Sequence, residues 1–331
     1  MGERMRSASR GRLAFVVCAA AGLLPVMLSA SAAPSPGQIA FSSTRDDGIT
    51  SEIYVMNDDG TDQRRLTWNA ADDGSPAWSP DGSRMVFVST RDGDTEIYVM
   101  GVDGSGQVQL THHPGYDLDP TWSPDGTRIA YVSVEGDRWD IYIMAADGSS
   151  PVRWSNLRGP VGSPAWSPDG TKMAFASDQE GIRVAEVGRL GAPLGATSLL
   201  VVGASPAWSP DGSHIAYSAI SEEGVGTHGP PDTNVDLYVV AADGGVPRRL
   251  TYEKGYDGHP SFSPDGARLA FASNRDGGWG VYAMSLDGGS VDRLTDHGME
   301  PAWSWSVPSG DTPVRPTGWG MLKGLVRVMG Q

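Results

Sequence analysis

The sequence has one cysteine, Cys18, in 331 residues, and it has few basic side chains. The 25 lysines and arginines stand against 40 aspartates and glutamates, so the formal net charge is −15. A single cysteine excludes an intramolecular disulfide, so packing must hold the fold together. The negative charge disfavours nucleic acids and anionic membrane surfaces as partners.

A hydrophobic run long enough to cross a membrane is also missing. The apolar run Leu13–Leu28 has 16 residues and contains Gly22 and Pro25, whereas a spanning helix needs about 20. Arginines precede this run and the small residues 29–33 follow it, which is typical of a secretory signal peptide. We therefore predict that residues 1–33 are removed and that the mature protein is periplasmic or extracellular. A retained membrane anchor is the alternative.

Removal of residues 1–33 would take away the cysteine, four arginines and one glutamate. The mature chain would then hold 21 basic and 39 acidic side chains, a net charge of −18. We expect it to be a monomer without a membrane span.

Helical periodicity is absent from residues 38–305. In this part of the chain a motif of seven residues recurs. The repeats are PAWSPDG at 76–82, PTWSPDG at 120–126, PAWSPDG at 164–170, PAWSPDG at 206–212 and PSFSPDG at 260–266. Successive copies start 44, 44, 42 and 54 residues apart, and a truncated copy, PAWSW, starts 41 residues later at Pro301. A period of this length, with several short strands in each unit, indicates a β-propeller.

Each repeat contains short runs rich in β-branched and aromatic residues, such as RMVFVS (84–89) and EIYVM (96–100). Ser-Pro-Asp-Gly predicts a tight hairpin after each first strand, because proline sets φ and glycine accepts a left-handed conformation. Asp-Gly pairs predict a second turn before each fourth strand. The tryptophans of the repeat, with Phe262 in the equivalent position, are predicted to be packing residues on the innermost strands.

The truncated copy explains how the ring closes. The first unit begins at QIAFSS (38–43), which matches a second strand, so this unit lacks a first strand. PAWSW (301–305) would supply that strand from the other end of the chain. The sequence therefore predicts an all-β, six-bladed propeller over residues 34–305, with four antiparallel strands per blade and no exposed sheet edge.

The order W-S-P-D-G, [IL]-A-[FY]-x-S and E-I-Y-V-M resembles the TolB-like six-bladed β-propeller family. The resemblance covers residues 38–305. It implies an exported propeller that binds protein partners. The protein that names the family carries an α/β domain before its propeller, and the resemblance here extends to the propeller alone.

The two faces of such a ring differ in this sequence. The uniform-turn face carries the Ser-Pro-Asp-Gly and Asp-Gly turns. The variable-loop face carries the loops between second and third strands and between blades, including 42–51, 134–140, 274–280 and the long 221–236. Binding usually resides in variable loops on a rigid scaffold. The residues before each repeat proline should surround the axial channel on this face; we call them the channel mouth. They are Ser75, Asp119, Ser163, Ser205, His259 and Glu300.

We predict that a protein or peptide partner binds to the variable-loop face. The candidate residues are Asp73, Asp117, Asp119, Asp257, His259, Glu300, Trp139, Trp279 and His228. Asp117, Asp119, Asp257 and Glu300 could hold calcium, which prefers oxygen ligands. The alternative is that the aspartates cap their own turns, with no cofactor bound.

Catalysis is a further alternative. His112, His113, His259 and His297 lie in blade-to-blade loops, as in propeller lyases and metal-dependent hydrolases. No zinc motif and no G-x-S-x-G accompanies them, however. A saccharide-binding or small-ligand module using the same face is also open. Residues 306–331 are predicted to be a proline-rich linker and a short amphipathic tail.

Overall fold

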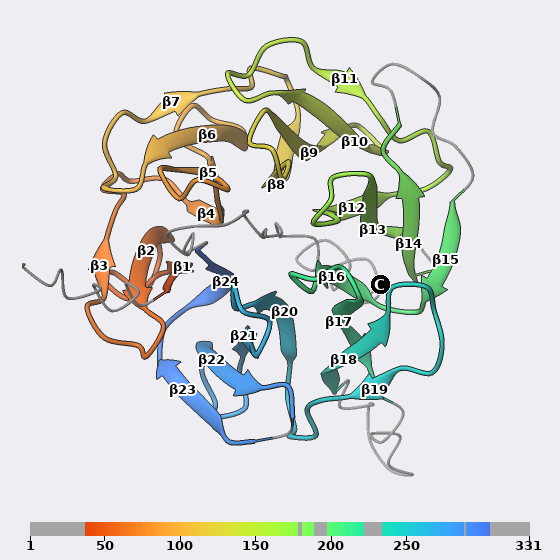
Figure 1. The fold of residues 1–331 in the computed structure, drawn as a ribbon. Helices are drawn as coiled ribbons and strands as arrows, with labels where there is room; N and C mark the ends of the chain where they lie inside the picture. The colour runs from red at the N-terminus through yellow and green to blue at the C-terminus, as the bar shows by residue number, and fades with distance from the viewer. Residues whose placement is uncertain (1–36, 178–180, 189–196, 222–233, 288, 305–331) are drawn as a thin grey trace, which may run out of the picture. The chain divides into compact units, whose positions relative to one another are not determined.

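The chain forms a ring of six four-stranded antiparallel sheets (Figure 1). The computed structural model describes residues 37–177, 181–188, 197–221, 234–287 and 289–304. These ranges contain 24 β-strands and no helix. No helix in them is therefore long and apolar enough to cross a membrane. The predicted leader and tail lie outside the described residues.

The six blades follow one another along the chain. Blade 1 contains β24 (Met299–Trp303), β1 (Gln38–Ser43), β2 (Glu52–Asn57) and β3 (Arg64–Arg65). Blade 2 contains β4 (Asp73–Trp78), β5 (Arg84–Ser89), β6 (Glu96–Gly101) and β7 (Val108–Gln109). Blade 3 contains β8 (Tyr116–Trp122), β9 (Arg128–Glu135), β10 (Arg138–Ala145) and β11 (Val152–Arg153).

The second half of the ring repeats this plan. Blade 4 contains β12 (Val161–Trp166), β13 (Lys172–Ser177), β14 (Gly181–Glu186) and β15 (Ser198–Val201). Blade 5 contains β16 (Ala204–Trp208), β17 (His214–Ile220), β18 (Val235–Ala241) and β19 (Arg248–Arg249). Blade 6 contains β20 (Asp257–Phe262), β21 (Arg268–Ser273), β22 (Gly280–Ser285) and β23 (Val291–Thr295).

The ring closes as the truncated repeat predicted. β24 pairs antiparallel with β1, with Trp303 opposite Ile39 and Ala302 opposite Ala40. The two strands are about 260 residues apart in sequence, yet they are neighbours in one sheet. This pairing confirms the six-bladed fold and removes the free edge that β1 would otherwise expose.

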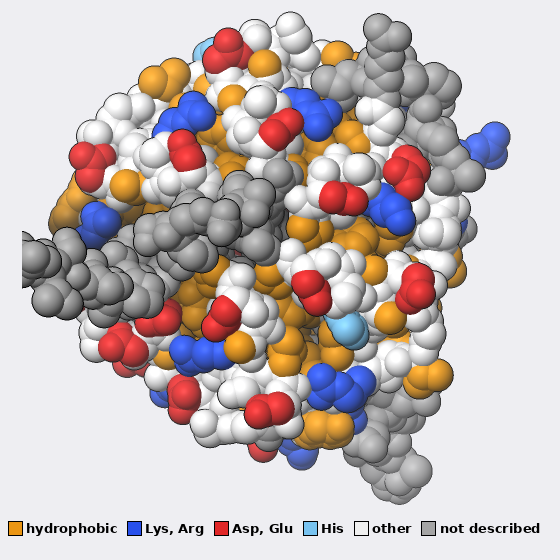
Figure 2. Space-filling view, in the orientation of Figure 1, with side chains coloured by type: hydrophobic (Ala, Val, Ile, Leu, Met, Phe, Trp, Pro, Cys, Tyr) orange, Lys and Arg blue, Asp and Glu red, His pale blue; other side chains and the backbone are white. Residues whose placement is uncertain are grey.

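The Ser-Pro-Asp-Gly turns are fixed by their own side chains. In blade 2, Asp81 accepts hydrogen bonds from the Ser79 hydroxyl (2.5 Å) and the Ser83 amide (3.0 Å). Gly82 has φ of 67°, which a side chain would strain. The same bonds recur in blades 3 to 6, through Asp125, Asp169, Asp211 and Asp265. Figure 2 shows a face of the ring around which acidic side chains recur, separated by hydrophobic ones.

The hydrophobic core is divided among the six gaps between blades. Each of the six clusters of buried residues combines two neighbouring blades. The repeat tryptophans are only 1–4% exposed, and Phe262 is 9% exposed. These rings are therefore packing residues.

The short fourth strands are attached to the third strands by hydroxyl groups. Thr67 accepts a hydrogen bond from the Ile53 amide (2.9 Å) and donates one to Glu52 (2.6 Å). Equivalent bonds join Thr111 to Glu96, Ser155 to Asp140 and Thr251 to Asp236. Because these acids lie at the start of the third strands, a buried polar layer runs beneath the variable-loop face.

Candidate binding face and channel mouth

All six channel-mouth residues adopt the left-handed backbone conformation. Their φ values are 49° for Ser75, 54° for Asp119, 47° for Ser163, 53° for Ser205, 57° for His259 and 53° for Glu300. The register of the innermost strand shifts at the same point in every blade, which marks a β-bulge. Such a conformation costs about 1–3 kcal/mol for each residue that is not glycine. Because this conformation recurs at the same position in all six blades, the six side chains leave the backbone in a similar orientation relative to their strands.

Two of the channel-mouth carboxylates bind the neighbouring blade. Asp119 Oδ2 accepts a hydrogen bond from the Ser163 amide at 3.0 Å. Glu300 Oε2 accepts one from the Ser75 amide at 2.8 Å and one from the Ser42 hydroxyl at 3.0 Å. The bonds from the Ser163 and Ser75 amides each join the channel-mouth residue of one blade to that of the next, whereas Ser42 belongs to the same blade as Glu300.

Several channel-mouth atoms are buried without a partner. Asp119 Oδ1, Ser163 Oγ and Ser205 Oγ make no hydrogen bond to any described residue. Native proteins leave few buried polar atoms in this state, and each exception needs an explanation. An axial ligand or water would supply the missing bonds.

Asp119 is the most perturbed carboxyl group of this ring. Burial is the main cause that raises its pKa from 3.8 to about 7; the Glu300 charge also raises it, and the hydrogen bond from Ser163 lowers it. Asp119 belongs to blade 3 and Glu300 to blade 1. The Glu300 charge therefore acts on Asp119 although blade 2 lies between their blades. At neutral pH, Asp119 therefore exists in both its neutral and its ionised form.

Aromatic side chains flank the channel mouth at blade 6. The Tyr256 ring lies 5.9 Å from the His259 ring and 5.2 Å from the Trp279 ring. Burial raises the pKa of Tyr256, so its phenol stays protonated. Trp279 keeps 39% of its surface exposed. Together these rings form an aromatic border on the variable-loop face.

The aspartates just before the channel mouth have other partners. Asp257 binds Arg275 at 2.7 Å and the Ser273 hydroxyl at 2.6 Å. Asp73 binds Arg91 at 3.1 Å and the Asn69 amide group at 2.6 Å. The alternative that these two aspartates cap their own turns is therefore wrong, because the arginine of the next loop takes the carboxylate.

Asp117 is the exception in this layer. At the position of Arg91 and Arg275, blade 3 carries Glu135, so the Asp117 carboxylate has no arginine partner. Its Oδ1 atom has no hydrogen-bond partner among the described residues. Burial raises the pKa of Asp117. Blade 3 thus contributes two buried acids, Asp117 and Asp119, with raised pKa values.

The four predicted calcium ligands do not form a donor set. Within the described ranges, no three His, Cys, Asp or Glu side chains are grouped closely enough to hold a metal ion. Asp257 is already paired with Arg275. His228 lies outside the described residues.

Trp139 does not lie in a loop, and this part of the prediction is wrong. It belongs to β10, faces Val134 of β9 across the hairpin, and packs partly buried against the core between blades 3 and 4. The hairpin continues to Glu135 and Arg138, so the expected loop 134–140 shortens to Gly136 and Asp137.

Two exposed aromatic residues outside the predicted site stack on arginines. Trp68 is 74% exposed and lies 4.3 Å from the Arg65 guanidinium. Tyr252 is 67% exposed and lies 4.6 Å from Arg249. Both follow the motif R-R-L-T, at 64–67 and 248–251, and this repeated signal could have identified them.

Comparison with known proteins establishes the family. The family described as the TolB beta propeller domain matches residues 22–118, 102–219 and 196–314. The chain belongs to this family. TolB of the Tol-Pal system of Bordetella pertussis is 45% identical over 56 residues, which are 17% of this chain and 13% of that protein.

Two further proteins are similar to this chain. An uncharacterized protein of Agrobacterium fabrum is 37% identical over 83 residues, 25% of this chain and 28% of that protein. The matched regions thus span less than a third of either relative. The crystal structure of TolB from Acinetobacter baumannii superposes with a TM-score of 0.69 at 24% identity, over 82% of this chain and 67% of that one. This similarity supports the propeller fold.

Proposed function

We propose that this protein is an exported, non-catalytic propeller that binds a protein or peptide through its variable-loop face, with the channel mouth at the centre. The observation that carries the proposal is the set of buried atoms without partners, Asp119 Oδ1, Ser163 Oγ and Ser205 Oγ. A buried polar atom without a hydrogen bond costs about 1–3 kcal/mol. A ligand that satisfies these atoms recovers that energy.

The charges of the site select the class of partner. Asp119 and Glu300 both belong to the channel mouth and their charges interact, and the whole chain carries a net charge of −15. Amide and ammonium N–H groups suit these acceptors, whereas phosphates and carboxylates are repelled. A peptide segment with backbone amides and a basic side chain meets both conditions.

The surrounding surface offers apolar contacts. Trp68, Tyr116, Tyr252 and Trp279 are 39–74% exposed. Exposed aromatic residues are frequent hot spots in protein interfaces. They would hold a partner whose terminus or loop enters the channel mouth.

Two further observations agree with this proposal. The N-terminal residues 1–33 have the pattern of a secretory signal peptide, which supports a partner in the periplasm or outside the cell. The relative in Bordetella pertussis is named a Tol-Pal system protein, and this name supports a role together with other proteins. We propose that the monomer binds its partner without a bound metal.

Selection of displayed random peptides on the secreted protein tests the proposal. We expect enriched peptides to lose at least about tenfold in affinity in the variant Asp119→Asn/Ser163→Ala, because the acceptors at the channel mouth are lost. The matched control, Asp125→Asn/Ser167→Ala, changes the same residue types on the same two blades at the uniform-turn face. Peptides that bind both variants equally well would place the site elsewhere.

A further inference from the structure

At three interfaces between adjacent blades, an arginine is stacked on an indole ring on the uniform-turn face. The arginine is the first residue of a second strand, and the tryptophan ends the first strand of the next blade. The pairs are Arg84–Trp122 at 4.7 Å, Arg128–Trp166 at 4.8 Å and Arg268–Trp303 at 5.5 Å. A cation over an aromatic face contributes about 0.5–2 kcal/mol. The stack also covers the gap between the two blades.

Both members of this pair are replaced between blades 5 and 6. His214 takes the position of the arginine and Phe262 that of the tryptophan. Two tryptophans of the repeat donate to the preceding blade: Trp78 Nε1 to the Ala302 carbonyl and Trp208 Nε1 to the Ala165 carbonyl, both at 3.1 Å. Trp122 Nε1 and Trp166 Nε1 have no partner among the described residues. Phenylalanine has no such donor. Phe262 is also the most exposed of the six rings, at 9%.

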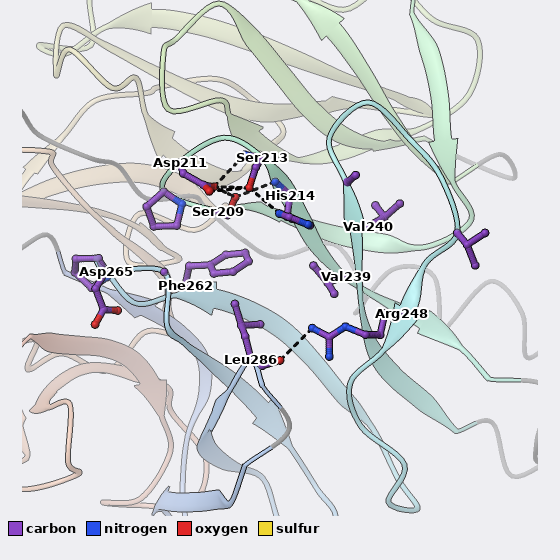
Figure 3. A pocket seen from close by; sticks show the side chains of 15 residues that line it. Ser209, Asp211, Ser213, His214, Val239, Val240, Arg248, Phe262, Asp265 and Leu286 are labelled. Atoms are coloured by element: carbon purple, nitrogen blue, oxygen red, sulfur yellow. Dashed lines mark hydrogen bonds between the residues drawn. The ribbon is translucent and has the colours of Figure 1, made fainter.

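A groove of about 600 Å³ opens at this interface (Figure 3). Its volume is within the range of sites that hold a small ligand or a side chain. Its apolar surface comes from Phe262, Val239, Val240, Val246 and Leu286. Pro210 and Pro264, from the two Ser-Pro-Asp-Gly turns, complete the lining.

The polar groups of the groove differ between its two ends. Arg248 donates a hydrogen bond to the Leu286 carbonyl at 3.0 Å and so holds the outer end. Asp211 and Asp265 lie at the inner end beside Phe262 (Figure 3). His214 hydrogen-bonds Ser213 through Nδ1 at 2.6 Å. The equivalent positions in blades 2, 3, 4 and 6 carry Arg84, Arg128, Lys172 and Arg268, so blade 5 alone among these five lacks a permanent cation next to its turn aspartate.

We propose that this groove binds a guanidinium or ammonium group on a flexible alkyl chain, such as an arginine side chain. The cation stacks on Phe262 beside Asp211, where the repeat elsewhere places its own arginine. The methylene groups lie along Val239 and Leu286, as long basic side chains do on apolar surfaces. The site is on the uniform-turn face and is therefore distinct from the channel mouth. Its ligand can be free arginine or an arginine residue within a peptide.

Calorimetric titration of the secreted protein with N-acetyl-arginine methylamide tests the chemistry. We expect saturable binding that weakens as salt is added, because the contact is between charges. The neutral analogue N-acetyl-norleucine methylamide should bind at least about tenfold more weakly. A parallel titration with a peptide in which one arginine is the only charged side chain distinguishes the two sources of the ligand, free arginine and an arginine residue within a peptide. Binding of neither arginine compound, or equal binding of the norleucine analogue, overturns the proposal.

The substitution His214→Arg tests the position. It restores the arginine of the repeat, which should stack on Phe262 and occupy the inner end of the groove. We expect an affinity for the arginine compounds at least about tenfold lower, with a melting temperature equal to or above that of the parent. Lys172→Arg, the matched control at the neighbouring interface, should leave the affinity unchanged. Unchanged affinity in His214→Arg overturns the proposal.

Discussion

Asp119 and Asp125 are six residues apart, before and after the end of the same strand, and the fold treats them in opposite ways. On the uniform-turn face, hydrogen bonds from Ser123 and Thr127 hold the pKa of Asp125 at about 2. At the channel mouth, burial raises the pKa of Asp119 to about 7. Asp125 uses its oxygens within its own turn, whereas Asp119 retains an oxygen without a partner among the described residues.

This difference separates acids that are bound within their own turn from acids that keep an oxygen without a partner among the described residues. An aspartate whose oxygens are bound within its own turn stabilises the fold. An aspartate held by the fold in a buried, strained and partly unsatisfied position lowers stability. Buried groups that lower the stability of the fold in this way are common at binding sites. These properties of Asp119 are the reason why we propose the channel mouth as the binding site, at which the fold is less stable and a partner is bound.

Opening the ring should lower the stability of the fold more than any other change, because the closed ring positions both Asp119 and Asp125. Deleting residues 301–331 removes most of β24, which exposes the edge of β1 in blade 1 and empties the cluster around Trp303. We expect loss of cooperative unfolding or aggregation. Deleting residues 312–331 should leave the melting temperature within a few degrees of the parent. Equal melting temperatures for the two deletions would contradict closure by β24.

Substituting the two aspartates should have opposite effects on stability at pH 8. In the folded state Asp119 binds its proton up to about pH 7, while in the unfolded state it releases it near 3.8. Its contribution to stability is therefore present below pH 3.8 and is lost as the pH rises to about 7. Asp119→Asn should thus raise the free energy of unfolding at pH 8 by a few kcal/mol at most, on the order of 1.4 kcal/mol per pKa unit.

Asp125→Ala should instead lower the free energy of unfolding by about 1–2 kcal/mol, because the bonds to Ser123 and Thr127 are lost. Denaturant unfolding of both variants between pH 4 and pH 8 measures these changes. The gain from Asp119→Asn should disappear toward pH 4. A gain that is constant over this range would show that Asp119 is ionised throughout.

Replacing residues 222–234 by a short Gly-Ser turn should affect binding more than stability. Long surface loops cost little entropy to close, so the melting temperature should change by only a few degrees. Partner affinity, measured with peptides selected on the parent, should fall. Retained affinity would remove this loop from the binding surface, although the channel mouth would remain a candidate.

Calcium should change the melting temperature less than any of these substitutions and deletions. Asp257 is neutralised by Arg275, so Asp117, Asp119, Asp257 and Glu300 do not act as four free carboxylates. We expect the same melting temperature in millimolar calcium and in chelator. A rise with calcium, by the linkage between binding and folding, would show that the channel mouth rearranges into a cation site.

The fold could be predicted almost completely because its signals are local. Proline, aspartate and glycine fix each hairpin within four residues, and the alternation of apolar residues fixes each strand. The hairpin of blade 3 was less predictable. Glu135 and Arg138 read as loop residues, but they pair across Gly136 and carry Trp139 into the core.

The candidate site could be predicted in position but not in chemistry. The sequence shows that six residues precede six prolines. It does not show which loops meet, and this decides that Asp257 binds Arg275 while Asp117 has no arginine partner among the described residues. Trp68 and Tyr252 follow a visible motif. Their exposure and their stacking on arginine become apparent only in the folded chain.

The sequence by itself determined the number of blades, the turns and the closure of the ring, because spacing and turn chemistry act over a few residues. The tertiary structure decided what each charged side chain does. The pKa of Asp119 depends on burial and on Glu300, and the groove at Phe262 depends on His214 from another blade. Both effects arise between residues far apart in sequence, since burial and electric field are properties of the assembled ring.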